Sequence, residues 1–431
     1  MSLPSYRPSV RAGAAFAVVS AAVFAVLPTR ALCAPDLPQI MADPDWIGSP
    51  VEAAWWQLDG RRALYRVKRS GSTLDDIVAI DLATGDTQVL DHAAQATTDG
   101  PAPVLDSTRQ RALFTRSGSL WMRHLENGEL RQLASADQPV RRAHFSADGA
   151  SVLFERGGRW WRYDLDSSIA HALTDLKFEK APYEVEAGSL AAEQVRLFVE
   201  VADDVTAERA AHDDARAGAA ADPGRAAAPW YLGPGKRIID AAPSADGRWL
   251  LAAIGAAKAE RGKQDHMPKF VTRSGYVEVE DVRTLVGRDA TEPTELWLLD
   301  LITQTKHEVD LSSLEGRDVD PLAALKATQD IEPHDGDDLR PVAITDFQWH
   351  PREAVALVQL FAIDNKDRWL LSVDARGEAP SSQQRHRLHD PAWVSYSFND
   401  FGWLDASSTR YWLLSEEDGY SHLYQGDLAR A

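Results

Sequence analysis

Short alternating stretches of apolar and polar residues recur along this chain, and an Asp-Gly-type turn precedes many of them. The clearest copies of the turn are Trp56–Gly60, Phe145–Gly149 and Pro243–Gly247, and degenerate copies begin at Val104 and Trp403. Asp-Gly pairs between apolar runs favour tight turns between antiparallel strands. The pattern predicts strands over Ala63–Lys68, Ile77–Leu82, Ala112–Thr115, Leu120–Leu125, Ser151–Glu155, Trp160–Leu165, Leu296–Leu301, Ala354–Phe361 and Trp369–Val373.

The turns are regularly spaced. Asp59, Asp106 and Asp148 lie 47 and 42 residues apart, and the 98 residues from Asp148 to Asp246 fit two further periods. Repeats of roughly 40–50 residues built from short strands are typical of β-propellers. We therefore expect an all-β fold over residues 34–431, a seven- or eight-bladed β-propeller that is incomplete at its C-terminal end.

Two stretches interrupt the strand pattern. Residues 203–236 are rich in Ala, Asp, Arg and Gly and nearly free of β-branched residues. Within them Val205–Ala217 favours a helix and Ala219–Pro229 a flexible linker. Residues 310–341 form a second, acidic excursion. Such insertions can form ligand sites or lids, but a long solvated loop is the simpler explanation.

The N-terminus has the form of a signal peptide over residues 1–33. Arg7 and Arg11 precede an apolar run from Ala12 to Leu27, and small residues follow near Cys33. A membrane anchor is the alternative, but the run is short for a bilayer span of about 20 residues. We expect an exported, periplasmic protein with no membrane span after cleavage; secretion and a signal anchor remain lesser alternatives.

Composition narrows the classes of partner. Cys33 is the only cysteine, so the mature chain can form no internal disulfide and has no cysteine nucleophile or metal ligand. The formal net charge is −19, and removal of the signal peptide would make it more negative because that segment carries arginines and no acid. An acidic surface argues against nucleic acid and anionic lipid as partners.

Motifs for catalysis, metals and cofactors are absent from the sequence. No Gly-x-Ser-x-Gly nucleophile elbow exists, and Gly419–His422 is better explained as part of a hairpin between Trp412–Ser415 and His422–Tyr424, which leaves Ser421 without a catalytic role. His386 and His389 are interpreted as solvent-facing histidines of an irregular connector. We therefore predict no catalytic residue, no metal and no cofactor in this chain.

One pair of carboxylates is a candidate binding site. Glu278 and Glu280 alternate with valine, so they would point to the same face of a strand. Paired carboxylates at the rim of a propeller could bind an ammonium group such as a peptide N-terminus. A solvated strand face, with Arg273 or Arg283 as counter-ion, is the simpler alternative.

The chain resembles exported bacterial proteins of the prolyl oligopeptidase superfamily, dipeptidyl-peptidase-IV branch. The most specific phrase is Leu414–Tyr424, with the sequence LSEEDGYSHLY; Asp43–Gly48, the repeated Asp-Gly units and Lys269–Tyr276 add looser matches. The resemblance covers nearly all of the mature chain but only the family's N-terminal propeller. It implies a propeller that covers an α/β-hydrolase domain carrying Ser, Asp and His, and that domain is absent from this chain.

The departure from the family leaves two hypotheses open. In the first, the chain is the substrate-gating propeller of a serine peptidase, not catalytically competent alone, and it meets peptides through a hydrolase domain missing here. In the second, it is a stand-alone periplasmic propeller that binds a protein or peptide. A homo-oligomer is compatible with either hypothesis. The family's Glu motif for the substrate amine has no clear copy, so Glu278 and Glu280 rest on their own chemistry. A propeller glycosidase would need a channel-facing carboxylate pair that a sequence cannot show.

Overall fold

The computed structural model describes residues 37–41, 47–135, 137–222, 225, 227–258, 262–285, 292–332, 339–395 and 397–429. The expected signal peptide, residues 1–33, lies outside the described residues. The chain divides into two compact units, one made of Met1–Ala54 with Arg62–Ala96 and the other of Trp55–Arg61 with Thr97–Ala431. Within the described residues, no helix combines the length and the apolar character needed to cross a membrane.

The first unit is built around a four-stranded antiparallel sheet. Its strands are β1 (Val51–Trp56), β2 (Arg62–Lys68), β3 (Asp75–Asp81) and β4 (Thr87–Val89), in that order. The short helices α1 (Leu37–Ile40) and α2 (His92–Gln95) flank it in sequence. Leu64, Val78 and Ala79 are buried, whereas β4 is exposed throughout, so one part of the sheet carries the apolar residues.

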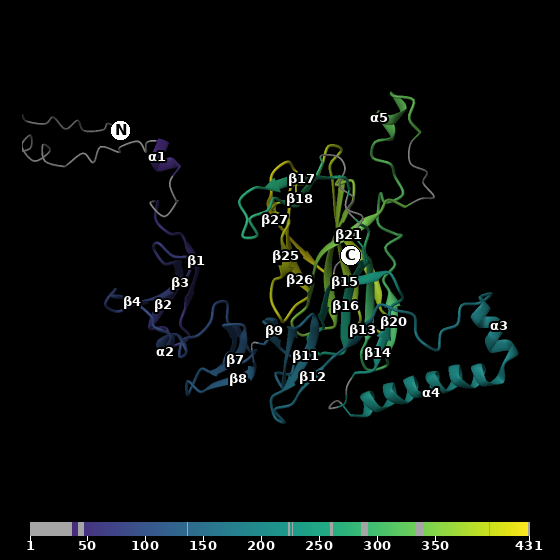
Figure 1. The fold of residues 1–431 in the computed structure, drawn as a ribbon, viewed down its shortest axis with the longest axis horizontal. Coiled ribbons are helices and arrows are strands. Elements are labelled where there is room, and N and C mark those ends of the chain that lie inside the picture. Colours follow the sequence, from purple (N-terminus) through teal and green to yellow (C-terminus); the bar gives the residue numbers. More distant parts are fainter. Residues whose placement is uncertain are drawn as a thin grey trace, which may run out of the picture. The chain divides into compact units, whose positions relative to one another are not determined.

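The second unit continues the same construction, and Figure 1 shows its sheets following one another along the chain. In its described part, each three- or four-stranded sheet is an antiparallel series of strands that are consecutive in the sequence or interrupted only by a hairpin. The four-stranded sheets are β5 (Val104–Leu105), β6 (Arg111–Arg116), β7 (Ser119–His124) and β8 (Leu130–Ala134); β9 (Val140–Phe145), β10 (Ser151–Arg156), β11 (Arg159–Asp164) and β12 (Ala170–Ala172); β15 (Lys236–Pro243), β16 (Trp249–Ala256), β19 (Glu295–Asp300) and β20 (Thr305–Glu308); and β21 (Val342–Trp349), β22 (Val355–Ala362), β23 (Asp367–Asp374) and β24 (Ser381–His389). A three-stranded sheet, β25 (Phe401–Trp403), β26 (Arg410–Ser415) and β27 (His422–Asp427), follows them.

Successive sheets pack face to face through apolar side chains. Phe154 and Leu120 belong to the cluster between the β5–β8 and β9–β12 sheets, and Leu153 lies with Leu250 in the next cluster. Trp369, fully buried, joins residues of β16, β19 and β21–β23. Repeated four-stranded antiparallel sheets stacked in this way form a β-propeller, which confirms the expected all-β propeller fold.

The Asp-Gly turns join the first and second strands of successive sheets. Ser146 Oγ donates to Asp148 Oδ1 (2.6 Å) and accepts from the Ser151 N–H (2.9 Å), and Ser244 makes the equivalent contacts with Asp246 and Trp249. The glycine of each turn has φ of +70°, a conformation that glycine adopts without steric cost. The repeated phrase in the sequence is therefore a repeated hydrogen-bonded turn.

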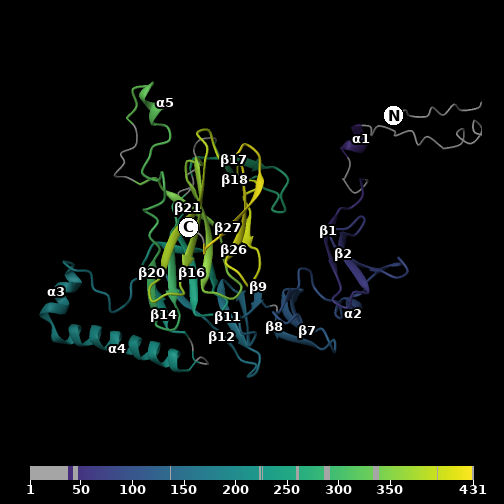
Figure 2. The same cartoon turned by 180° about the vertical axis from the view of Figure 1, so that it is seen from behind.

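The helical insertion leaves the sheets earlier than residue 203. It follows β13 (Asp175–Lys177), contains α3 (Leu190–Leu197) and α4 (Val199–Ala221), and returns at β14 (Pro229–Tyr231), which pairs with β13 in parallel. The helix expected over Val205–Ala217 is thus part of a longer one. Figures 1 and 2 both show α4 beside the sheets rather than between them.

Side chains on α4 attach it to the second unit. His212 lies 3.1 Å from the Pro229 carbonyl oxygen and 3.3 Å from the Tyr183 hydroxyl. Arg216 donates to the carbonyl oxygens of Thr303 and Gln304 at 3.0 and 2.8 Å. The helix is therefore held by polar contacts together with the packing of the His212 ring against Tyr183 and Tyr231.

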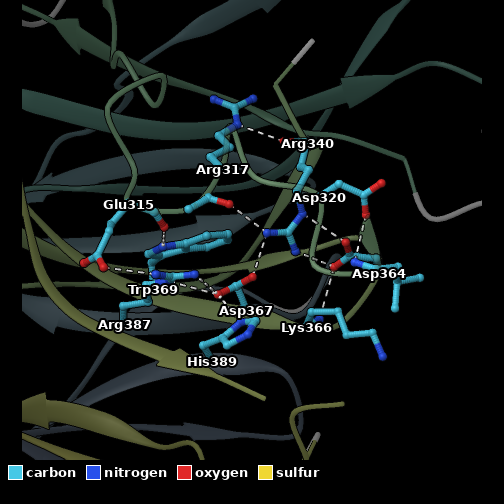
Figure 3. A network of polar contacts seen from close by, with 12 residues as sticks. Glu315, Arg317, Asp320, Arg340, Asp364, Lys366, Asp367, Trp369, Arg387 and His389 are labelled. Atoms are coloured by element: carbon cyan, nitrogen blue, oxygen red, sulfur yellow. Dashed lines mark hydrogen bonds and ion pairs between the residues drawn. The ribbon is translucent and has the colours of Figure 1, made fainter. Parts of the chain in front are cut away.

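A buried ionic network fixes the second excursion, residues 310–341, which lies between β20 and β21 and contains α5 (Ala323–Ala327). Figure 3 shows Asp367, whose side chain is completely buried, facing Arg340, Arg387 and His389. Its carboxylate oxygens lie 2.7 Å from Arg340, 2.9 Å from Arg387 and 2.9 Å from the His389 Nδ1.

The excursion contributes its own groups to this network. Arg340 also binds Asp364 through two nitrogens and donates to the Gly316 carbonyl oxygen, and Arg387 lies 3.0 Å from Glu315. The Trp369 indole N–H donates to the Glu315 carbonyl oxygen (3.1 Å). These contacts connect both ends of the excursion to the β21–β24 sheet (Figure 3).

Candidate functional site

A cavity lies where the first strands of successive sheets converge. It encloses about 580 Å³ and is lined by residues of β5, β9, β15 and β21 and of the turns that follow them and β25. The first strand of each propeller sheet faces the central channel, so we name this space the axial cavity. Its volume falls within the roughly 300–1,000 Å³ of typical small-ligand sites.

A shared backbone irregularity shapes the inner end of the axial cavity. In β9, β15 and β21 the pairing with the second strand shifts, so that each first strand carries one extra residue. Arg142, Asp240 and Asp346 occupy equivalent positions at these bulges, each four residues before the residue that closes the turn, Ser146, Ser244 or His350. Bulges redirect side chains, which brings these three charged groups together.

The inner end of the axial cavity is acidic. Arg142 lies 2.8 Å from Asp240 and 3.1 Å from Glu155, so its single charge is shared between two carboxylates. Asp346 lines the cavity beside them. Desolvation by the surrounding residues raises the pKa of Asp346, and the nearby negative charge of Asp240 raises it further.

His144 supplies an uncharged polar group next to this acidic end. Its Nδ1 lies 3.1 Å from the Arg142 carbonyl oxygen, and its ring packs edge-on against Trp160 with centroids 5.8 Å apart. Desolvation lowers the pKa of His144, although the contact with the carbonyl opposes this and the charge of Arg142 adds to it. With Nδ1 protonated toward the carbonyl, Nε2 of the neutral ring is an acceptor.

Aromatic side chains form the walls of the axial cavity. The indole N–H groups of Trp160 and Trp349 donate to the carbonyl oxygens of Ala241 (2.7 Å) and Ala242 (2.8 Å). Phe145, Phe347 and Pro243 complete the apolar surface. Because the indole donors are already bonded, these walls offer apolar contact without an unsatisfied polar atom.

The outer end is formed by the turn after β21. His350 is buried and its Nδ1 accepts from the backbone N–H groups of Arg352 (3.2 Å) and Glu353 (3.0 Å). This arrangement fixes the turn, and the exposed guanidinium of Arg352 lines the cavity there. Asp106 also lines this end, but Arg111 (2.8 Å), Thr108 (2.9 Å) and the Gln110 N–H (2.8 Å) bind its carboxylate.

The carboxylates predicted from the sequence lie elsewhere. Glu278 and Glu280 are exposed on the hairpin of β17 (Gln264–Lys269) and β18 (Glu278–Thr284), which is inserted between β16 and β19. Glu280 lies 2.5 Å from Lys269, and Glu278 accepts from the Ser274 hydroxyl at 2.7 Å. Lys269, rather than Arg273 or Arg283, is therefore the counter-ion of Glu280.

Two other sequence interpretations can be compared with the structure. The hairpin expected around Ser421 is present as β26 and β27, and the Ser421 hydroxyl donates to the Phe398 carbonyl oxygen. The interpretation of His386 and His389 as connector residues is wrong, because both belong to β24. His386 lies 2.8 Å from Glu417, and His389 belongs to the buried network around Asp367.

The residues of the axial cavity were not identified from the sequence. A signal was nevertheless present, since Arg142 and Asp240 occupy the same place in two copies of the Asp-Gly phrase. In the described part of the chain, no three His, Cys, Asp or Glu side chains are grouped in a way that could hold a metal ion.

Comparisons with known proteins find similarity only among solved structures. No protein-family model and no curated protein matches the chain. Among solved structures, it is similar to a protein assigned as dipeptidyl aminopeptidase IV from Bacteroides ovatus, at 13% identity and a TM-score of 0.39 over 86% of this chain and 42% of that one. It is also similar to dipeptidyl peptidase 4 from Porphyromonas gingivalis, at 14% identity and a TM-score of 0.42 over 91% and 47%, and to TolB from Acinetobacter baumannii, at 14% identity and a TM-score of 0.24 over 78% and 57%. The chain spans less than half the length of the two peptidases.

Proposed function

We propose that this chain is the substrate-gating propeller of an exported serine peptidase of the dipeptidyl-peptidase-IV type and has no hydrolytic activity by itself. In this role it would admit peptides in the periplasm and present them to an α/β-hydrolase domain. The observation that carries the proposal is the axial cavity, an apolar-walled space with charged groups at both ends. The LSEEDGYSHLY phrase over Leu414–Tyr424 supports the choice of this family for the proposal.

The exposed pair Glu278 and Glu280 belongs to this proposal as a contact for the free amine of the substrate. Both carboxylates stand on a hairpin that projects from the blade between β16 and β19. A substrate ammonium would compete with Lys269 for Glu280 and with the Ser274 hydroxyl for Glu278. These exposed contacts are individually weak, about 0–1 kcal/mol for an exposed ion pair. Replacing them by contacts with the substrate ammonium would therefore cost little free energy.

A stand-alone periplasmic propeller that binds a protein or peptide is the second candidate. The feature that favours it is the exposed apolar tip of the same hairpin, where Phe270, Val271 and Tyr276 are 74%, 98% and 80% exposed. Exposed apolar groups of this kind are common at protein-binding surfaces.

The coding sequence downstream of codon 431 tests the proposal directly. A continuation that encodes Gly-x-Ser-x-Gly, followed by Asp and His, would support it, and a stop codon followed by non-coding sequence would overturn it in favour of the stand-alone propeller. The purified chain should not hydrolyse dipeptidyl p-nitroanilides. Hydrolysis by the chain alone that a serine-directed phosphonylating reagent abolishes would contradict the lack of activity.

The role of the Glu pair needs the complete enzyme. With the hydrolase domain present, Glu278→Gln with Glu280→Gln should raise KM for substrates with a free N-terminus at least tenfold. The matched control is Glu126→Gln, an exposed carboxylate in the loop between β7 and β8. An unchanged KM in the double variant would remove the pair from the proposal.

A further inference from the structure

The axial cavity is elongated along the first strands of the sheets. Its lining includes Arg142 to Ala147 on one side and Asp346 to Arg352 on another. Three residues of strand from Asp346 to Trp349 span about 10 Å at roughly 3.3 Å per residue, and the turn to Arg352 extends the wall further. An extended peptide of three or four residues has a comparable length, about 10–14 Å.

The two ends of the axial cavity differ in charge. At the inner end, Arg142 and Asp346 line the cavity, and Asp240 and Glu155, which do not line it, both bind the Arg142 guanidinium. Asp346 is therefore the carboxylate that this end offers to a ligand. At the outer end, Arg352 is exposed, while the carboxylate of Asp106 is already engaged by Arg111. A ligand of matching polarity carries a cation at its inner end and an anion at its outer end.

We propose that the axial cavity binds a short, unblocked peptide in extended conformation, with its ammonium group at Asp346 and its carboxylate at Arg352. The proposal rests on the proposed function only in taking peptides as the class of ligand. The aromatic walls formed by Trp160, Trp349 and Phe347 receive the apolar side chains, and the neutral ring of His144 accepts a hydrogen bond from the ammonium or the first peptide N–H.

Other classes of ligand fit the axial cavity less well. A nucleotide or sugar phosphate would bring negative charge to an end where Asp346 lines the wall and two further carboxylates already engage Arg142. An uncharged oligosaccharide would use the aromatic walls but would leave the ends of opposite charge without partners. A zwitterionic peptide satisfies the walls and both ends, and it would also relieve the repulsion between Asp240 and Asp346.

Titration calorimetry with the tripeptide Ala-Phe-Ala and the full chain tests this assignment. The N-acetylated and C-amidated forms should each bind at least tenfold more weakly than the free tripeptide. Asp346→Asn should lower the affinity for the free tripeptide about tenfold and leave the affinity for the acetylated form unchanged. The reason is that the substitution and the acetylation remove the same ion pair. Arg352→Gln should remove the preference for the free carboxylate over the amide in the same way.

Matched controls separate loss of this site from a general change in charge and from unfolding. Glu126→Gln, which removes an exposed carboxylate outside the axial cavity, should leave tripeptide binding unchanged. The near-ultraviolet circular dichroism of Asp346→Asn should match that of the parent. Asparagine can retain the contact that Asp346 Oδ1 makes with the Phe347 N–H. Equal affinity for the free and acetylated tripeptides, or no binding of either, would overturn the assignment.

The outcome is independent of the test of the proposed function. Free-tripeptide binding that depends on Asp346 would stand even if no hydrolase domain followed codon 431. Conversely, a downstream hydrolase domain would not rescue the assignment if the tripeptide failed to bind.

Discussion

Replacement of Asp367 by asparagine should be among the most destabilising single polar substitutions in the second unit. The side chain is fully buried, and Arg340, Arg387 and His389 all contact its carboxylate. The change keeps the volume of the side chain but removes the negative charge and leaves two guanidinium groups facing an amide. Breaking a buried ion pair typically costs about 3–5 kcal/mol.

The remaining partners determine where in that range the cost should lie. Arg340 would retain Asp364, and Arg387 would retain Glu315, so neither guanidinium would be left without a carboxylate (Figure 3). We therefore expect a loss of about 3 kcal/mol, the lower end of the range. Asp364→Asn is the matched control: this carboxylate is 36% exposed, and Arg340 would keep Asp367, so the expected cost is about 1 kcal/mol.

Urea unfolding followed by tryptophan fluorescence measures both variants. For an m value of about 3 kcal/mol/M, Asp367→Asn should lower the midpoint by about 1 M and Asp364→Asn by about a third of that. In an Arg340→Gln background the cost of Asp367→Asn should shrink, because part of the interaction has already been removed. A midpoint for Asp367→Asn equal to that of Asp364→Asn would refute the argument that this network holds the 310–341 excursion.

Three further predictions concern the repeated unit. Phe154→Ala leaves a cavity at a fully buried site between two sheets. It should lower the free energy of unfolding, measured by thermal unfolding, by about 3–5 kcal/mol. A loss below about 1 kcal/mol would show that the sheets do not pack there as described. Gly247→Ala places a side chain at φ of +70° and should lower the free energy of unfolding by about 1–2 kcal/mol. Gly377→Ala, at a residue without positive φ, should leave the free energy of unfolding nearly unchanged. Equal effects of the two substitutions would argue against a strained turn. Burial alone would raise the pKa of Asp106, but the Arg111 guanidinium and backbone N–H donors outweigh it and hold that pKa below its usual value. The ionised carboxylate therefore stabilises the fold at neutral pH, and this contribution is lost when the carboxylate is protonated in acid. Below about pH 4 the free energy of unfolding of the parent should therefore fall faster than that of Asp106→Asn. Identical pH profiles for the two proteins would contradict this.

The sequence was most informative where one side of a strand is apolar. The segments expected as strands at Ser151–Glu155, Trp160–Leu165 and Trp369–Val373 coincide with β10, β11 and β23 to within one or two residues at each end. These strands carry buried residues in sequence-adjacent or alternating positions, and the Asp-Gly turns define where they begin. The apolar pattern and the turn residues were therefore sufficient to predict the positions of these strands.

The outer strand β24 and the inserted pair β13–β14 were missed because they lack that apolar signal. In β24, Leu388 is the one buried residue, and polar residues fill the rest of Ser381–His389. This strand is held by its pairing with β23 and by contacts such as that of Arg387 with Asp367, which join residues 20 positions apart. The parallel pair β13–β14 spans a still longer separation, from Asp175 to Pro229.

The axial cavity was missed for a different reason. Alternation of apolar and polar residues with a period of two predicts a strand. A bulge inserts one residue and so moves the following side chains to the opposite face of the sheet. Alternation alone therefore does not predict which residue of the strand faces the channel. Arg142, Asp240 and Asp346 become neighbours only when three sheets are placed side by side. The exposed Glu278 and Glu280, in contrast, were found because they follow simple alternation.

The bulges in β9, β15 and β21 also have a consequence for how such a protein can diversify. The extra residue without a partner is Ile239 in β15 and Thr345 in β21. The charged residues beside the bulges, at positions 142, 240 and 346, lie outside the apolar clusters that join the sheets. Substitutions at these three positions could therefore alter the charge of the channel while the apolar clusters stay intact. One scaffold could acquire a different ligand preference through a few changes that leave its cores unaltered.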